Sequence, residues 1–333
     1  MAQAAQVLEL LRARPGTYLS GEELSTKLDV SRTMIWKHIR QLEAAGYVIE
    51  AVPHVGYRLV TAPDRLLPAE ILAGLATKRL GRSVISFQET TSTNDRALEL
   101  AARNQPEGVV VTAEHQTRGR GRRERVWHSR PGQNILFTVL FRPPWIAEQA
   151  PLVTLLMAVA VVEGIHRTTG LWARIKWPND LLVDGAKVAG ILTESQAQAD
   201  RIAFAVCGVG VNVNEAPRQQ VRYPAASLAG LLGRPQPRVP LLQEILLAAD
   251  GLYAKALKEG PRPIIDAWQR HALAMGMHIQ VDLPDGSQMT GMGMGVDESG
   301  ALLVRLENGL TRRLTSGEVR ALRPSRAETP ETE

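Results

Sequence analysis

The sequence predicts an α+β protein built from three folded parts that follow one another along the chain. Residues 1–62 read as helices followed by a hairpin, 63–274 alternate between strands and helices, and 275–324 have an apolar/polar period of two. Alternating strands and helices are typical of an α/β domain, whereas a strand-only run with regular turns favours a small barrel or sandwich. The polar residues 325–333 are expected to form a disordered tail.

The N-terminal part has the element order of a winged helix-turn-helix. Ser20 and Glu23 form a capping box that opens a second helix, and Asp29-Val30-Ser31 is a tight turn into a third. A helix in this place enters the major groove of DNA, and six residues are expected to contact DNA there: Ser31, Arg32, Thr33, Trp36, Lys37 and Arg40. Residues 1–60 hold seven Lys or Arg against six Asp or Glu, so a protein-interaction or dimerisation module is the alternative.

The central part is predicted to be a single α/β domain entered through a proline-containing linker. Strands are expected near 84–88, 109–114, 134–141, 173–176, 188–193 and 202–211, and helices near 95–104, 152–169, 241–257 and 264–273. Turn signals at Pro284-Asp285-Gly286 and Asn308-Gly309 mark the C-terminal β part.

Composition indicates an ordinary globular protein. Of the 333 residues, 44% are hydrophobic and 22% charged, and neither a signal peptide nor an apolar run of membrane-spanning length is expected. We therefore expect a cytoplasmic protein with no membrane partner. The single cysteine, Cys207, lies in an apolar run and is expected to be a buried structural thiol, so disulfides and cysteine metal sites are excluded.

The segment Thr117–Trp127 has the composition of an anion-binding loop. It carries two glycines, Gly119 and Gly121, among five arginines: Arg118, Arg120, Arg122, Arg123 and Arg125. Glycines let backbone N–H groups turn toward a phosphate, and guanidinium groups bind phosphate or carboxylate oxygens in two places. A nucleic-acid patch, a localisation signal or a solvated surface is the alternative for such a short basic tract.

Further motifs place polar groups at strand ends. Lys176-Trp177-Pro178-Asn179-Asp180 follows a short strand, where the lysine is well placed to project into a cleft, although a solvated turn is the plainer interpretation. Lys187 precedes an apolar run containing Gly190, and Gly208–Asn212 ends another strand. Thr91–Asp95 caps a helix, and its hydroxyls could also face a ligand. No Walker, dinucleotide or zinc motif is present.

In order and spacing, these motifs together resemble those of biotin–protein ligases of the bifunctional bacterial type, which also repress the biotin operon. The resemblance covers nearly the whole chain and implies a biotin-ligase-type catalytic domain with a mixed sheet and a C-terminal SH3-like β-barrel. One departure is visible, because Glu124 stands where that type carries glycine.

The resemblance implies an ATP-dependent reaction assisted by Mg²⁺. Biotin would be converted to biotinyl-5'-AMP and then passed to a lysine of the biotin carboxyl carrier protein of acetyl-CoA carboxylase. The adenylate-bound homodimer would bind operator DNA and repress biotin synthesis genes.

The resemblance also implies site residues. Lys176, Arg120 and Arg122 would be catalytic and would contact biotin, together with Ser92, Thr93, Asn94, Gln116 and Gly190. ATP and the adenylate would be bound by Gly119, Arg120, Gly121, Arg122, Arg123, Trp127, Lys176 and Asn212. Metal ligands are not assigned, since Mg²⁺ prefers phosphate oxygens and water.

Three alternatives remain open at this point. The chain could be a regulator that senses biotin without transferring it, although a sensor would not need Lys176 and the whole arginine loop. It could be a lipoate or octanoate ligase, but Glu124-Arg125 rather than a glycine run follows Arg122-Arg123. It could also be a ligase whose N-terminal domain is an inactive remnant.

Overall fold

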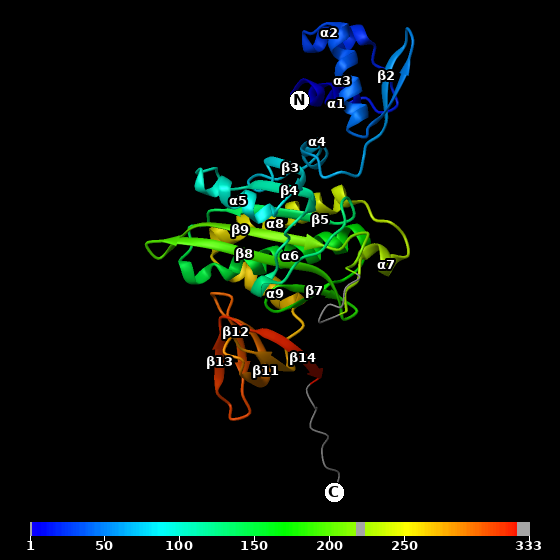
Figure 1. Cartoon of the computed structure of the whole chain (residues 1–333). Helices are drawn as coiled ribbons and strands as arrows, with labels where there is room; N and C mark the ends of the chain where they lie inside the picture. Colours follow the sequence, from blue (N-terminus) through cyan, green and yellow to red (C-terminus); the bar gives the residue numbers. More distant parts are fainter. Residues whose placement is uncertain (1, 218–223, 325–333) are drawn as a thin grey trace. The chain divides into compact units, whose positions relative to one another are not determined.

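The computed structural model describes residues 2–217 and 224–324, which form two compact units, Met1–Arg65 and Leu66–Glu333 (Figure 1). The predicted disordered tail, residues 325–333, lies outside the described residues.

The first unit confirms the predicted winged helix-turn-helix. It contains three helices and an antiparallel hairpin: α1 (Ala2–Arg12), α2 (Gly21–Leu28), α3 (Arg32–Ala44), β1 (Val48–Val52) and β2 (Gly56–Thr61). Ser20 caps α2 by accepting a hydrogen bond from the Glu23 N–H at 3.0 Å, as the capping box predicts. Asp29 ends α2 in the left-handed conformation, and Leu8, Leu24 and Ile35 are fully buried between the helices.

The second unit is organised around a seven-stranded mixed sheet of order β3-β4-β5-β9-β8-β7-β6. Strands β3 and β4 are parallel, and the other neighbours are antiparallel. The strands are β3 (Ser83–Thr90), β4 (Val109–Gln116), β5 (Ile135–Phe141), β6 (Arg174–Lys176), β7 (Asp180–Val183), β8 (Ala186–Gln198) and β9 (Arg201–Val211). Strand β7 was not predicted, because its four residues directly follow a proline turn, and neither were two five-residue helices, α4 (Pro68–Leu72) and α7 (Leu228–Leu232).

Side chains alternate between the two faces of this sheet, and longer helices cover both faces. Phe137 and Val209 belong to the large core shared with α6, α8 and α9, whereas Leu140 and Val206 pack with α5 on the opposite face. These helices are α5 (Thr93–Ala102), α6 (Pro151–Thr169), α8 (Arg238–Glu259) and α9 (Arg262–His271).

Helix α6 corrects one expectation from the sequence. The helical segment Ala147–Thr169 is long and apolar enough to cross a membrane by length and composition, with a mean hydropathy of 1.5 over 18 residues. In the structure 67% of that window is buried inside the protein, which is the behaviour of a core helix.

Cys207 of β9 is fully buried, as predicted, and burial raises the pKa of its thiol to about 12.

The C-terminal β part, called here the C-terminal domain, confirms the predicted small β structure. It is a five-stranded antiparallel sheet of order β13-β12-β11-β10-β14, formed by β10 (Met277–Asp282), β11 (Gln288–Val296), β12 (Leu302–Arg305), β13 (Thr311–Leu314) and β14 (Glu318–Pro324). It contacts the central domain through Arg313, which pairs with Glu148, and through the Gly300 carbonyl, which accepts from Trp177 Nε1 at 3.4 Å.

Candidate active site

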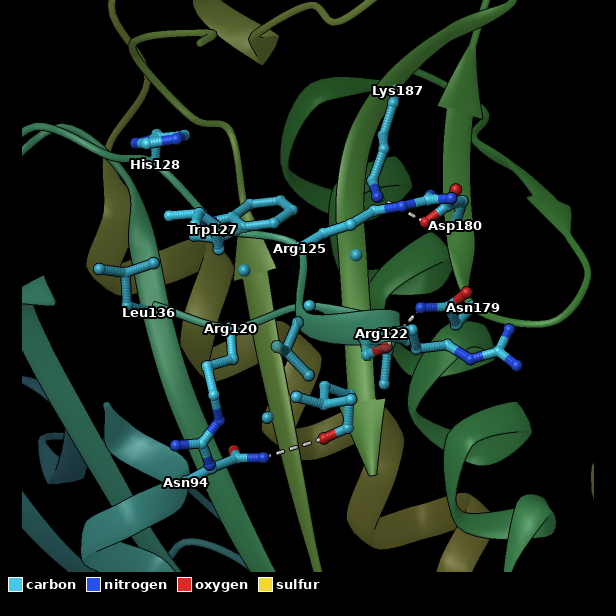
Figure 2. A pocket seen from close by; sticks show the side chains of 18 of the residues that line it. Asn94, Arg120, Arg122, Arg125, Trp127, His128, Leu136, Asn179, Asp180 and Lys187 are labelled. Carbon is cyan, nitrogen blue, oxygen red and sulfur yellow. Dashed lines mark hydrogen bonds and ion pairs between the residues drawn. The ribbon is translucent and has the colours of Figure 1, made fainter. Parts of the chain in front are cut away.

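A cavity of about 530 Å³ lies over the part of the sheet where three glycines meet (Figure 2). In the strand register Gly210 is paired with Gly190, and Gly208 faces Thr138. The next cross-strand pair on the same face of the sheet, Leu140 with Val206, packs against α5. Because Gly190 on β8 and Gly208 and Gly210 on β9 have no side chains, the sheet surface is hollow just beyond the N-terminus of α5.

The glycines are needed because other groups occupy the space that their Cβ atoms would take. A Cβ on Gly208 would lie 2.1 Å from Asn94 Oδ1, and one on Gly210 would lie 2.4 Å from the Trp127 ring. On Gly190 it would lie 2.9 Å from the same ring. Asn94 and Trp127 thus rest directly on the glycine floor, one at each side of the cavity (Figure 2).

The side of the cavity nearest α5 is a polar wall lined by Ser92, Thr93, Asn94 and Gln116, with Thr138 hydrogen-bonded behind it. Gln116 Oε1 accepts from the backbone N–H of Thr93 at 2.7 Å and from its hydroxyl at 3.0 Å. Thr138 Oγ1 lies 2.8 Å from Thr93 Oγ1 and 2.7 Å from Asn94 Oδ1. Ser92 caps α5 by accepting from the Asn94 N–H. Because these groups are mostly buried and bonded to one another, the wall is rigid before any ligand binds.

The opposite side is built by the turn that follows β6. Lys176 is only 5% exposed and lines the cavity. The Trp177–Pro178 peptide bond is cis, and Asn179 Nδ2 donates to the Ile191 carbonyl at 2.7 Å. Lys187 Nζ lies 2.6 Å from Asp180 Oδ1 and 5.5 Å from the centre of the Trp127 ring. Two lysines therefore bring positive charge to this side.

The arginine loop, Thr117–Trp127, is a small hairpin that closes on itself. Trp127 N–H donates to the Gly119 carbonyl at 2.9 Å, and Gly121 N–H donates to the Arg125 carbonyl at 2.7 Å. At its tip Glu124 has a φ of 58°, in the left-handed region that favours glycine. This conformation explains why the pattern that the sequence resembles has glycine at this position, where this chain has Glu124.

The tip of the arginine loop contacts the C-terminal domain. Arg122 Nη1 donates to the Gly317 carbonyl at 3.3 Å, and Arg125 Nη2 lies 2.8 Å from Glu318 Oε2. Burial lowers the pKa of Arg122 below its usual value, and the charge of Arg123 lowers it further. A negative ligand beside Arg122 would relieve this unfavourable crowding of positive charge.

Most of the residues that the sequence predicted for the site come together around this cavity: Ser92, Thr93, Asn94, Gln116, Arg120, Gly121, Arg122, Arg123, Trp127, Lys176, Gly190 and Asn212. Gly119 is not among the lining residues. A Cβ on Gly119 would meet the Trp127 carbonyl at 2.5 Å, so this glycine closes the hairpin. Asn212 is buried, and its Nδ2 donates to the Ala226 carbonyl at 3.2 Å.

Several lining residues were not among the site residues that the resemblance implied, although Arg125, Asp180 and Lys187 belong to the motifs that carried it: Arg125, His128, Leu136, Asp180, Lys187 and Glu318. Leu136 sits in an apolar strand that reads as core, and Glu318 lies almost 200 residues along the chain from the arginine loop that it contacts. Asp180 is the first residue of the unexpected strand β7 and Lys187 lies in β8, so their pairing could have been predicted from a β7–β8 hairpin.

In the first unit, the outer face of α3 is exposed at every position predicted to contact DNA: Ser31, Arg32, Thr33, Trp36, Lys37 and Arg40. Trp36 is 50% exposed, and the Arg40 guanidinium lies 5.5 Å from the centre of its ring. Arg32 pairs with Glu22 at 2.6 Å. The face thus presents cationic and hydrogen-bonding groups that solvent and partners can reach.

The fold and the cavity define a class of protein: a catalytic domain of the ligase type preceded by a helix-turn-helix. The family model described as "Biotin/lipoate A/B protein ligase family" matches residues 84–212. Models described as "HTH domain" and "Biotin protein ligase C terminal domain" match residues 3–58 and 275–320.

Individual relatives agree with these models. The chain is 38% identical to the "Bifunctional ligase/repressor BirA" of Bacillus subtilis, over 92% of this chain and 95% of that one. It is 32% identical to the "Biotin--[acetyl-CoA-carboxylase] ligase" of Mycobacterium tuberculosis, over 79% and 100%. The solved "Biotin protein ligase from Aquifex aeolicus in complex with biotin and ATP" is similar at a TM-score of 0.60 and 27% identity, over 73% and 100%. The chain belongs to the biotin protein ligase family, in the group with an N-terminal helix-turn-helix, and is a biotin ligase that uses biotin and ATP.

Proposed function

We propose that the enzyme makes biotinyl-5'-AMP in the cavity described above and then biotinylates a lysine of the biotin carboxyl carrier protein of acetyl-CoA carboxylase. The observation that carries the proposal is that a buried lysine, an arginine loop and a polar wall share one cavity of about 530 Å³. The carrier is inferred from the Mycobacterium tuberculosis relative, whose name specifies acetyl-CoA carboxylase.

In the first step a carboxylate oxygen of biotin attacks the α-phosphorus of ATP, and the bond to pyrophosphate breaks as the new O–P bond forms. The nucleophile belongs to the substrate, so the enzyme needs no nucleophilic side chain. Lys176 and Arg122 line the cavity from two sides and can share the negative charge of the carboxylate and the α-phosphate. Catalysis then consists of positioning and charge stabilisation.

The polar wall supplies the groups that would orient biotin. The ureido ring of biotin has both N–H donors and a carbonyl acceptor, and Ser92, Thr93 and Gln116 offer hydroxyl and amide partners at one end of the cavity. Gly190 also lines the cavity, and the bicycle would approach the backbone of β8 beside the Trp127 ring, which occupies the space over this glycine. Trp127 and Asn212 lie farther along the cavity and would bound the adenylate.

In the second step the neutral amine of the carrier lysine attacks the acyl carbon of the mixed anhydride. An amide bond forms, AMP leaves, and the proton of the amine passes to solvent. Water would hydrolyse the same anhydride, so the arginine loop has to cover it until the carrier arrives.

Mg²⁺ would enter with the nucleotide. Residues 2–217 and 224–324 contain no group of three or more His, Cys, Asp or Glu that could hold a metal ion. Asp180, the first residue of β7, lines the cavity but is paired with Lys187. These residues do not fit a protein-built metal site, so phosphate oxygens and water would be the ligands of the ion.

The first unit would bind operator DNA through the exposed face of α3 when the adenylate is bound, and would thereby repress biotin synthesis genes. Support comes from that face and from the name of the Bacillus subtilis relative, "Bifunctional ligase/repressor". Helix-turn-helix repressors usually bind two half-sites as a dimer, so a homodimer of the adenylate-bound protein is part of the proposal. A cytoplasmic location follows from ATP, carrier and DNA as partners.

The test is pyrophosphate release and adenylate trapping from labelled ATP and Mg²⁺ with biotin, lipoate or no acid added. The expected result is a biotin-dependent adenylate that stays bound to the protein until its biotinyl group is transferred to a carrier domain, with release of AMP. Binding of biotin without pyrophosphate release would instead support a biotin-sensing regulator. A gel-shift assay with DNA from upstream of biotin genes, run with and without biotin plus ATP, tests the repressor half separately.

A further inference from the structure

Arg120 differs from the other arginines of the loop because carboxylates of the central domain hold its guanidinium. Its Nη1 lies 2.5 Å from Asp95 Oδ1, and its Nη2 lies 3.3 Å from Glu194 Oε2. Arg122 and Arg125, in contrast, contact the C-terminal domain. The arginine loop is therefore anchored at two points, its first part on α5 and β8 and its tip on the C-terminal domain.

Glu194 also contacts the polar wall. Its Oε2 accepts a hydrogen bond from Asn94 Nδ2 at 2.7 Å, while the Oδ1 of the same amide lies 2.7 Å from Thr138 Oγ1. Asn94 is 3% exposed and rests on Gly208, so it has little room to move. The Glu194 carboxylate thus connects the polar wall, where biotin would bind, directly to Arg120 of the arginine loop.

The local charge balance argues against Arg120 as a direct anion ligand. Asp95 and Glu194 carry two formal negative charges against the single positive charge of Arg120. Partial burial lowers the pKa of Arg120, but the hydrogen bond that Arg120 donates to Asp95 and the charges of both carboxylates offset this and raise the pKa overall. An approaching carboxylate or phosphate would be repelled here, whereas Arg122 and Lys176 offer cationic groups on other sides of the cavity.

We propose that Glu194, together with Asp95, is a positioning residue that fixes Arg120 as the stationary base of the arginine loop. Asn94 lines the biotin pocket and hydrogen-bonds Glu194, so a bound biotin would hold the base of the loop in place. Arg122 then closes over the adenylate from this fixed base. The resemblance implies direct contact of Arg120 with the substrates, whereas these ion pairs favour an indirect role. The inference rests on the proposed function of the cavity.

The test is Glu194→Gln, which keeps the size of the side chain and one acceptor but removes its charge. We expect biotinyl-5'-AMP to dissociate about tenfold faster and the KM for biotin to rise by roughly three- to tenfold, as for loss of a charge-assisted hydrogen bond. The KM for ATP and the melting temperature should change little, which separates positioning from general destabilisation. Glu99→Gln is the matched control, because Glu99 is an exposed glutamate of α5 paired with Arg96.

A double-mutant cycle makes the result specific. If Glu194 acts through Arg120, then Glu194→Gln should add little to Arg120→Gln, and Asp95→Asn should reproduce the faster release. Adenylate release and a KM for biotin within twofold of wild type in Glu194→Gln would overturn the inference, as would additive effects in the double variant. If the wild-type enzyme fails to form adenylate at all, the proposed function fails instead, so the two failures are distinguishable.

Discussion

The polar wall and the arginine loop enclose the same cavity but are built in opposite ways. The wall consists mostly of buried side chains that hydrogen-bond to one another, such as Thr93 with Gln116 and Thr138. The arginine loop consists mainly of exposed side chains held by ion pairs to neighbouring elements, such as Arg125 with Glu318. At the tip of the loop, ion pairs of half-exposed arginines such as Arg125 contribute about 0–1 kcal/mol each and exchange more readily than the contacts of a satisfied buried network. The wall is therefore suited to selecting biotin, and the loop to opening and closing over the adenylate.

The largest effect is expected from Lys176, on the side of the cavity opposite the polar wall. Lys176→Met removes a buried positive charge from the reacting centre, and adenylate formation should fall by about 10²–10³-fold, the size of effect seen when one electrostatic transition-state contact is lost. Pyrophosphate release from labelled ATP measures it. Lys255→Met, at an exposed position of α8, is the control. Retention of a tenth or more of wild-type activity would remove Lys176 from the mechanism.

The rigidity of the polar wall can be tested at Gly208, one of the three glycines under the cavity. In Gly208→Ala the new Cβ would lie 2.1 Å from Asn94 Oδ1, and the crowding should weaken biotin binding by about 1–3 kcal/mol, or roughly 5- to 150-fold. Titration calorimetry measures the dissociation constant. Gly251→Ala is the matched control, since no atom lies within 4 Å of its Cβ position in α8. Equal biotin affinity of the two variants would contradict a rigid wall.

A substitution in the arginine loop should change the dissociation rate of the adenylate rather than the affinity for biotin. Arg122→Gly removes the guanidinium expected to cover the adenylate and should speed its dissociation by roughly tenfold, the size expected for a charge-assisted contact. Biotin affinity should stay within about threefold, because the polar wall is untouched. The release of labelled adenylate under a chase of unlabelled ligand gives the rate. Equal dissociation rates for variant and wild type would show that Arg122 does not retain the intermediate.

The smallest effect concerns the tip of the loop. Glu124→Gly removes a side chain from a residue with a φ of 58° and should stabilise the loop by about 1 kcal/mol at most, because the relief of strain is partly offset by the greater freedom of glycine in the unfolded chain. We expect a slightly slower release of adenylate and an unchanged KM for biotin. Faster release would mean that the Glu124 side chain itself helps to close the loop.

How far the sequence predicts this site depends on how local each feature is. The arginine loop, Lys176 and Ser92–Asn94 lie in short motifs whose chemistry is visible in consecutive residues, and the structure brings them to one cavity. The recognition-helix face followed in the same way from helical periodicity. Cys207 was predicted to be buried from the apolar residues on either side of it.

Features that depend on distant parts of the chain could not be predicted. The contact of Arg125 with Glu318 joins residues 193 positions apart, and the buried ion pair of Arg238 with Glu114, at 2.7 Å, joins residues 124 apart. Thr138 reads as one more residue of an apolar strand until the register places it opposite Gly208. Strand β7 is too short for its period to be recognised.

The most direct test of the central claim measures two quantities on the same three proteins: wild type, Gly208→Ala and Arg122→Gly. The quantities are the dissociation constant of biotin and the dissociation rate of bound biotinyl-5'-AMP. We predict that Gly208→Ala weakens biotin binding strongly, whereas Arg122→Gly speeds adenylate release and leaves biotin binding nearly unchanged. If both substitutions changed both quantities to the same extent, the division of the cavity into a selecting wall and a retaining loop would be contradicted.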